Sequence, residues 1–275
     1  FIQSINYMNK LKYWIIVIIF TFLSCSEYIR ILPGSYIGNL YTSDNQPIPF
    51  NLYLLNDGSV QIYNGKEIVH MEKILYTNDS VIIKSPVFEG YIKAKSLSKG
   101  MAGYFFNNSL NRKIKFNAMP GYERFKTENN KINYNFSGKW KVVFNPGQLD
   151  EYDAIGLFNQ KNSKISGTFQ TTTGDYGFME GVSEENSLML STFNGARSYL
   201  FKGQIHDNII KGYFYRGNYN KIPFIAYRDD DFILPDPNSL TVISDQYNKF
   251  EFSFEDGEGR TISDDDTIFH KDRKS

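Results

Sequence analysis

The sequence has few of the side chains from which metal sites and covalent catalysis are built. Its single cysteine is Cys25, and its three histidines, His70, His206 and His270, stand far apart. A zinc site needs several such ligands at close spacing, and a disulfide needs a second cysteine. Signatures of serine hydrolases, phosphate-binding loops and dinucleotide folds are also missing. We therefore expect no metal and no cofactor.

The chain also lacks net charge, because 30 basic residues balance 30 acidic ones. A chain without net positive charge does not attract nucleic acid or anionic lipid electrostatically. We therefore expect no nucleic-acid partner. Any attachment to a membrane would have to come from a covalent lipid.

No hydrophobic run is long enough to span a membrane as a helix. The longest, from Tyr13 to Leu23, has 11 residues, whereas a spanning helix needs about 20. Lys10 and Lys12 precede it and small residues follow it, which is typical of an export signal rather than of a core helix. We predict a signal peptide over residues 8–25 and interpret residues 1–7, before Met8, as upstream translation.

Cys25 lies at the end of this signal. Leu23-Ser24-Cys25 resembles the lipobox of bacterial lipoproteins. The resemblance implies cleavage before Cys25, lipidation of its thiol and a place on the periplasmic face of a bacterial membrane. The alternative is that Cys25 is only a small apolar residue. We favour the anchor because no second cysteine is present for a disulfide.

What the sequence has in abundance is short runs in which apolar and polar residues alternate. Examples are "SVQIYNG", "KISGTFQT" and "NKFEFSF", with turn residues between such runs. This spacing is typical of antiparallel sheets that close into barrels or sandwiches. We predict an all-β protein with few helices.

An internal repeat divides these strands into two groups. Gly34-Ser35-Tyr36 matches Gly138-Lys139-Trp140, and further matches follow in the same order at offsets between 104 and 109 residues. They pair Phe88-Glu89-Gly90 with Phe193-Asn194-Gly195, Gly103-Tyr104-Phe105 with Gly212-Tyr213-Phe214, and Ile114–Ala118 with Ile222–Ala226. Such self-similarity indicates two tandem copies of one supersecondary unit.

We place the first β unit at residues 31–119 and the second at 137–228, with linkers at 120–136 and 229–248. Each unit resembles the lipocalin-like plan of a small antiparallel barrel, in which Tyr36 or Trp140 would plug one end. Barrels of this size either fill with side chains or hold one small ligand. Both possibilities are open for this sequence.

Acidic residues offer two weak candidate sites. Asp150, Glu151 and Asp153 form an acidic loop, and a pair of carboxylates is what glycoside hydrolysis requires. Nothing in the sequence fixes a second carboxylate across a cleft, so a solvated hairpin is the simpler interpretation. Asp229–Asp231 lacks the alternating ligands of a calcium loop and is interpreted as part of a linker.

The stretch from Gly138 to Leu240 carries a more specific likeness. "GKWKVVFNPGQLDEYDAIGLFNQ", "IKGYFYRGNY" and "DDDFILPDPNSLT" resemble the N-terminal region of TlpA-type thiol-disulfide oxidoreductases. Residues 249–275 are similar to the opening hairpin of a thioredoxin-like α/β domain, which would be incomplete here. The resemblance implies that the redox Cys-x-x-Cys motif lies beyond Ser275.

Three functional hypotheses follow. The first is the non-catalytic N-terminal part of a lipid-anchored TlpA-type oxidoreductase, whose parent protein acts in disulfide reduction and redox homeostasis on protein thiol or disulfide clients. The second is a complete lipoprotein that binds a small ligand or glycan. The third, a glycosidase, depends only on the Asp150 loop. The chain itself supplies no catalytic residue for the first, because thiol-disulfide exchange needs a thiolate and a resolving cysteine.

Overall fold

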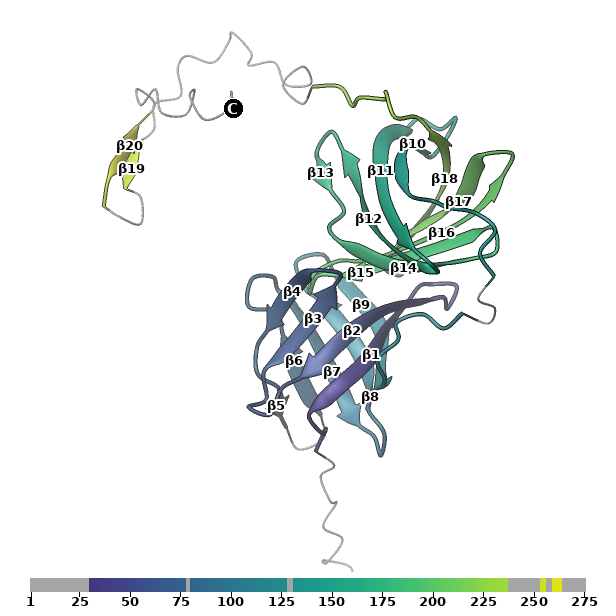
Figure 1. Ribbon diagram of the computed structural model, residues 1–275. Coiled ribbons are helices and arrows are strands. Elements are labelled where there is room, and N and C mark those ends of the chain that lie inside the picture. Colours follow the sequence, from purple (N-terminus) through teal and green to yellow (C-terminus); the bar gives the residue numbers. More distant parts are fainter. Residues whose placement is uncertain (1–29, 78–79, 128–130, 237–252, 256–258, 264–275) are drawn as a thin grey trace, which may run out of the picture. The chain divides into compact units, whose positions relative to one another are not determined.

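The computed structural model describes residues 30–77, 80–127, 131–236, 253–255 and 259–263 (Figure 1). All regular elements in these ranges are strands, and the prediction of an all-β protein is confirmed. No helix in the described residues could cross a membrane. The signal at residues 8–25, with Cys25, lies outside them.

The first sheet is open and strongly curled (Figure 1). Its strand order is β4-β3-β2-β1-β9-β8-β7-β6-β5, and every pair is antiparallel. A hydrogen bond of 2.8 Å from the Glu72 backbone N–H to the Lys84 carbonyl links the chain after β4 to β6. The strands are β1 (Gly34–Tyr41), β2 (Pro47–Leu54), β3 (Val60–Asn64), β4 (Glu67–Met71), β5 (Leu75–Tyr76), β6 (Val81–Lys84), β7 (Gly90–Ser96), β8 (Met101–Asn107) and β9 (Arg112–Pro120).

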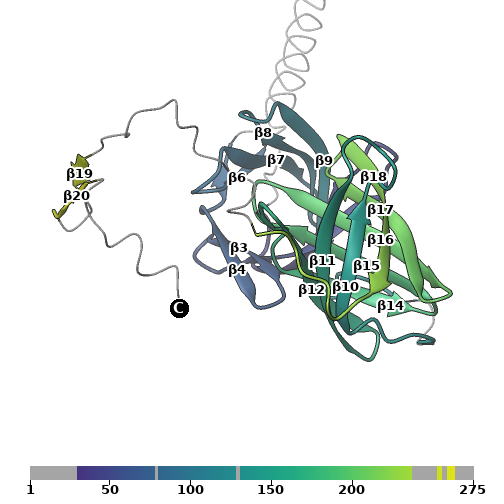
Figure 2. The ribbon, with the colours of Figure 1, turned by 90° about the horizontal axis from the view of Figure 1, so that it is seen from above.

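The second sheet closes into a barrel. β11 pairs with both β10 and β12, so eight strands form a ring, and the short β13 pairs with the end of β12. Figure 2 shows β18, β17 and β16 side by side in this wall. The strands are β10 (Gly138–Phe144), β11 (Tyr152–Lys161), β12 (Lys164–Thr171), β13 (Gly174–Asp175), β14 (Met179–Glu184), β15 (Ser187–Phe193), β16 (Ser198–His206), β17 (Ile209–Arg216) and β18 (Asn220–Arg228).

Local chemistry explains the hairpins. Asp207 and Asn208 connect β16 to β17 with φ of 49° and 61°. Positive φ at both central residues is the requirement of a two-residue type I′ turn, and Asp and Asn tolerate it better than most residues. Next to this turn β16 alternates, with Gly203 and Ile205 buried and Gln204 and His206 exposed, as a sheet with one face toward a core demands.

The repeat seen in the sequence recurs in the three-dimensional contacts. A Cβ at Gly103 would lie 2.2 Å from the Lys93 carbonyl oxygen, and one at Gly212 would lie 2.0 Å from that of Lys202. Both strands therefore need glycine at the same place, because a neighbouring backbone occupies the space of a side chain.

One of the sequence matches does not extend to the structure. Phe88 lies exposed in the loop before β7, whereas Phe193 ends β15 and is fully buried. Phe193 is buried in the core of the first sheet rather than of its own barrel. These two phenylalanines therefore match in the sequence but do not occupy equivalent positions in the two units.

Stacked phenylalanine rings fill the second barrel. Phe201 and Phe214 have ring centroids 4.1 Å apart and nearly parallel planes, and Phe169 stacks on Phe201 at the same distance. Phe144 and Phe224 pack around them. Of the two possibilities for a small barrel, a packed core describes this part of the interior.

A separate unit spans Pro235–Ser275. Its described strands, β19 (Ser253–Glu255) and β20 (Thr261–Ser263), form an antiparallel hairpin. This hairpin lies within the segment that we expect to open a thioredoxin-like domain. Asp256 and Gly257, which the sequence predicts as the turn of this hairpin, lie outside the described residues.

Candidate functional site

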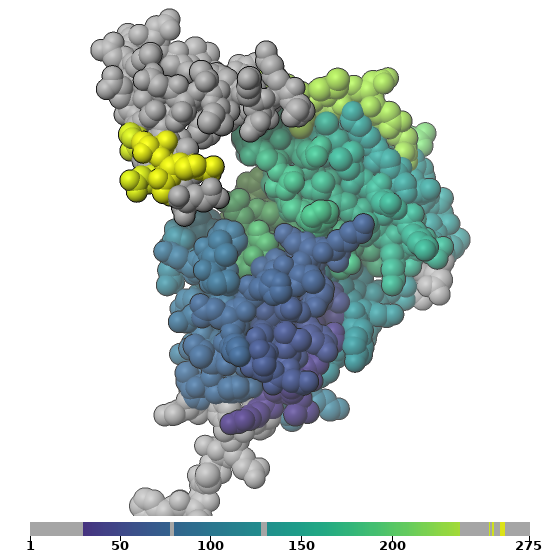
Figure 3. Space-filling view, turned by 60° about the vertical axis from the view of Figure 1, so that its left-hand side comes forward, coloured from purple at the N-terminus to yellow at the C-terminus, as the bar shows by residue number. Residues whose placement is uncertain are grey.

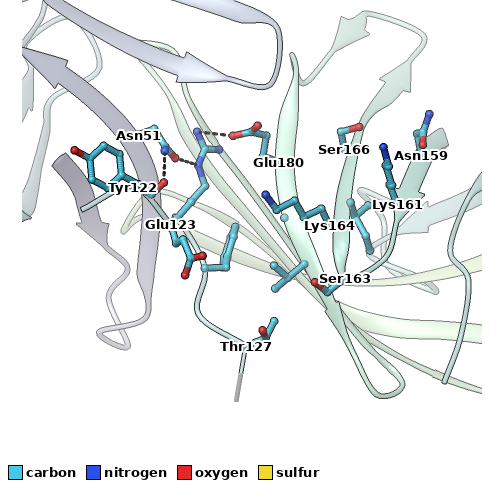
Figure 4. Close-up of a pocket in the computed structure, with 15 residues that line it drawn as sticks. Asn51, Tyr122, Glu123, Thr127, Asn159, Lys161, Ser163, Lys164, Ser166 and Glu180 are labelled. Atoms are coloured by element: carbon cyan, nitrogen blue, oxygen red, sulfur yellow. Dashed lines mark hydrogen bonds and ion pairs between the residues drawn. The ribbon is translucent and has the colours of Figure 1, made fainter. Parts of the chain in front are cut away.

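The segment between the two sheets contributes a buried arginine, Arg124. Its Nε donates to Asn51 Oδ1 at 2.9 Å, and its Nη1 donates to the Ser191 carbonyl at 2.9 Å. Its Nη2 donates to the Tyr63 carbonyl and lies 3.5 Å from a Glu180 carboxylate oxygen (Figure 4). One guanidinium thus connects β2 and β3 of the first sheet to β14 and β15 of the second.

Burial sets the electrostatics of this arginine. Removal from water lowers the pKa of Arg124 to about 10, and the Glu180 carboxylate opposes that shift. The guanidinium therefore stays charged at neutral pH. A buried charge is tolerated only when its donors are paired, and the carbonyl and carboxylate partners meet that need.

A second contact fixes the same junction. Asn64 pairs its side-chain amide with the backbone of Phe193, donating to the carbonyl at 2.9 Å and accepting from the N–H at 3.3 Å. The Phe193 ring then packs against Phe50 and Phe105, with centroids 4.7 and 5.1 Å away. Figure 3 shows atoms of the first sheet directly against those of the second. We call this set, Asn51, Asn64, Arg124, Glu180, Ser191 and Phe193, the barrel junction.

A polar cleft of about 480 Å³ lies beside the barrel junction (Figure 4). Lys161 and Lys164 line it from the β11–β12 hairpin, and Tyr122 and Glu123 from the segment after β9. Neither histidine nor cysteine lines it, and its charged groups besides Arg124 are Glu123, Glu180 and the two lysines.

A different polar site lies at one end of the second barrel. β11 and β16 begin there and β12 and β17 end there, which follows from their antiparallel pairing. The Tyr152 and Tyr176 hydroxyls are 2.7 Å apart, and Arg216 Nη2 donates to them at 2.9 and 3.1 Å. Together with Arg112, Arg197, Tyr199 and Tyr219 they line a cavity of about 530 Å³. We call these seven residues the barrel mouth.

Burial favours the neutral form of two phenols of the barrel mouth, Tyr152 and Tyr199. Burial raises the pKa of Tyr152 far above its ordinary value, and the hydrogen bond with Tyr176 adds to the shift. Burial also raises the pKa of Tyr199. Neutral hydroxyls can both donate and accept hydrogen bonds, so the barrel mouth offers polar contacts without negative charge from these tyrosines.

The acidic candidates from the sequence lie in local contacts. Asp150 accepts a hydrogen bond from Asn145 Nδ2 at 2.7 Å, and Glu151 accepts one from the Gly147 N–H at 2.5 Å. Asp153 lies 3.5 Å from Lys141 Nζ. Asp229 accepts backbone N–H groups of the following turn. In the described ranges no three His, Cys, Asp or Glu side chains gather where they could hold a metal.

The remaining candidates are scattered. His70 and His206 are exposed on separate sheets, and His270 and Cys25 lie outside the described residues. Sequence reasoning missed both Arg124 and Arg216. Arg124 stands in a polar, Asn-rich stretch, and neither residue belongs to a motif whose spacing would predict a site.

Comparison with known protein families and with curated proteins finds no match. Among solved structures, one that is similar is described as a "putative outer membrane protein" from Bacteroides fragilis. It is 12% identical, with a TM-score of 0.23, and the alignment covers 72% of this chain and 96% of that one. This likeness carries no information about the barrel junction or the barrel mouth.

Proposed function

We propose that this chain is the non-catalytic N-terminal part of a lipid-anchored, TlpA-type thiol-disulfide oxidoreductase of the bacterial envelope. The two β units act as one rigid spacer that holds a redox domain away from the membrane and presents a surface to its client proteins. The redox chemistry belongs to the parent protein, on cysteines beyond Ser275.

The observation that carries the rigid-spacer proposal is the barrel junction. Arg124 and Phe193 bind the two units through buried polar and aromatic contacts. Two β units on a flexible linker would move independently, whereas buried contacts of this kind couple neighbouring units. The lipobox-like Leu23-Ser24-Cys25 and the strand pattern after Lys249 support the envelope location and the redox parent.

The test is to identify the polypeptide that the native gene produces. We expect an intact mass above the 31.8 kDa of this chain and a Cys-x-x-Cys motif in the added segment. That longer protein should reduce a disulfide substrate such as insulin, and serine at either added cysteine should abolish the activity. A native product that ends at Ser275 would refute the proposal.

The alternative, a complete lipoprotein that binds a small ligand or glycan, is favoured by a different observation. The rings of the second barrel pack against each other, so a ligand would bind at the polar barrel mouth rather than among them. A thermal-shift screen tests it, since a ligand that binds only the folded state raises the unfolding temperature.

A further inference from the structure

The barrel mouth gathers three arginines from separate elements. Arg112 begins β9, Arg197 lies between β15 and β16, and Arg216 ends β17. Repulsion among guanidinium groups opposes such a cluster unless something offsets it. The hydrogen bond of Arg197 with Tyr199 raises the pKa of Arg197, and the charge of Arg216 opposes that shift.

Protein carboxylates do not provide that offset. In the described part of the chain, none of these three arginines takes part in an ion pair. The Asp175 carboxylate lines the cavity without an ion pair to any of the three, and its Oδ1 accepts the Gly177 N–H at 2.9 Å. The contrast with Arg124 is direct, because that guanidinium has carbonyl, amide and carboxylate partners around it.

Two buried donors of the barrel mouth have no hydrogen-bond partner among the described residues. Arg216 uses Nη2 on Tyr152 and Tyr176, while its Nε is buried without a hydrogen-bond partner among the described residues. The Nε of Arg112 is in the same state, and its guanidinium lies 3.7 Å above the Tyr219 ring. Buried donors without partners are uncommon in folded proteins and call for a ligand or another explanation.

We infer that the barrel mouth is a binding site for a small oxyanionic ligand, a carboxylate or phosphate group carried by a molecule of sugar size. A planar guanidinium presents a fork of donors that matches carboxylate and phosphate oxygens. The tyrosine hydroxyls and the Thr171–Thr173 segment supply neutral polar contacts to the rest of the ligand. The cavity volume of about 530 Å³ suits one small molecule, since such sites commonly measure roughly 300 to 1,000 Å³.

This inference does not depend on the proposed function. A spacer of a redox protein and a complete lipoprotein could both carry such a site. Failure of the redox proposal would leave the ligand test unchanged, and absence of ligand binding would leave the intact-mass test unchanged.

Calorimetric titration at low ionic strength tests the inference with three probes: inorganic phosphate, glucuronate and glucose. Glucuronate and glucose differ by one carboxylate, so their comparison isolates the anion. We expect phosphate or glucuronate to bind with a measurable heat and glucose to bind at least about tenfold more weakly, the loss expected when a charge-assisted hydrogen bond is removed. The two anionic probes distinguish a phosphate ligand from a sugar acid.

Three variants locate the site. Arg216→Gln and Arg197→Gln should each weaken binding of the effective anion by about tenfold or more. Lys164→Gln, which removes the same charge from the cleft beside the barrel junction, should leave binding unchanged. Far-ultraviolet circular dichroism and thermal unfolding of each variant establish that it is folded before it is titrated.

Four results would overturn the inference. The first is that neither anion binds to the folded wild-type chain, and the second is that glucose and glucuronate bind equally while phosphate does not bind. The third is that anion binding survives in both folded arginine variants. The fourth is that Lys164→Gln weakens anion binding as much as the arginine variants do. The last would mean that general surface charge, rather than the barrel mouth, attracts the anion.

Discussion

Tyr36 and Trp140 make the same contact in the two β units. The Tyr36 hydroxyl donates to the Leu32 carbonyl at 2.6 Å, and Trp140 Nε1 donates to the Phe136 carbonyl at 2.9 Å. Each donor reaches four residues back and each ring is buried. The opening aromatic therefore holds the chain that enters β1 or β10 against the end of its own unit.

We predict that Trp140→Phe destabilises the second barrel. The change removes an indole N–H and leaves the Phe136 carbonyl without its donor, at a cost of about 1 to 3 kcal/mol in unfolding free energy. Tyr36→Phe is the matched change in the first unit and should cost about 1 kcal/mol. Urea unfolding followed by circular dichroism measures both, and unchanged stability in both variants would mean that neither hydrogen bond matters.

A second prediction concerns the coupling of the two units through Arg124. Arg124→Met leaves the Tyr63 and Ser191 carbonyls without a donor and should lower the unfolding free energy by about 2 to 4 kcal/mol. Because the tryptophans are Trp14 and Trp140, fluorescence of a chain without its signal reports the second barrel alone. We expect fluorescence and circular dichroism transitions to coincide in the wild type and to separate in the variant.

The control for this prediction is Lys161→Met. Lys161 lines the same cleft but is exposed, so its replacement should leave the transitions coincident and the stability nearly unchanged. Coincident transitions in Arg124→Met would show that Phe193 and Asn64 alone suffice to couple the units.

The fold class could be predicted from the sequence because strand alternation and repeat spacing are local signals. The pattern of "KISGTFQT" predicts a strand without knowledge of its neighbours, and these eight residues are the whole of β12. Gly103 and Gly212 could be matched because a neighbouring backbone comes close to the strand in both copies, and this position therefore requires glycine. Such local signals can be recognised in a single sequence, without an alignment of homologues.

The two arginine sites could not be predicted in the same way. The partners of Arg124 stand 56 to 73 residues away along the chain, and no local pattern connects them. The two copies also differ in whether the sheet closes. In the second sheet β12 pairs with β14 and the ring is closed, whereas in the first sheet β4 does not pair with β6 and the sheet stays open. That difference depends on pairing between strands that no tight turn connects, whereas turn type and loop length fix the register only within hairpins.

A third prediction concerns the export signal. Cys25→Ser removes the thiol that would carry the lipid, so the protein should move from the membrane fraction to the soluble fraction of the envelope. Ser26→Ala keeps the cysteine and should remain with the membrane. Fractionation and immunoblotting measure the distribution, and membrane retention of the Cys25→Ser protein would mean that lipidation is not its anchor.

The last prediction is a pH dependence that originates at the barrel mouth. Burial, with help from the hydrogen bond to Tyr176, raises the pKa of Tyr152 above its ordinary value of 10.0. An unfolded tyrosine loses its proton near pH 10 while folded Tyr152 keeps it, so above that pH the folded state binds more protons. The unfolding free energy must then fall as the pH rises through about 10 and beyond.

Tyr152→Phe isolates this contribution. At pH 7 the variant should lose about 1 kcal/mol, because the hydroxyl contacts with Tyr176 and Arg216 are gone. Above pH 10 its stability should decline less steeply than that of the wild type, so the two curves converge. The lowered pKa of Arg124 acts with the opposite sign but is common to both proteins and cancels in their difference. Tyr213→Phe, at an exposed tyrosine of β17, is the control, and its curve of stability against pH should be parallel to that of the wild type. If the Tyr152→Phe curve is also parallel, Tyr152 titrates alike in the folded and unfolded chains.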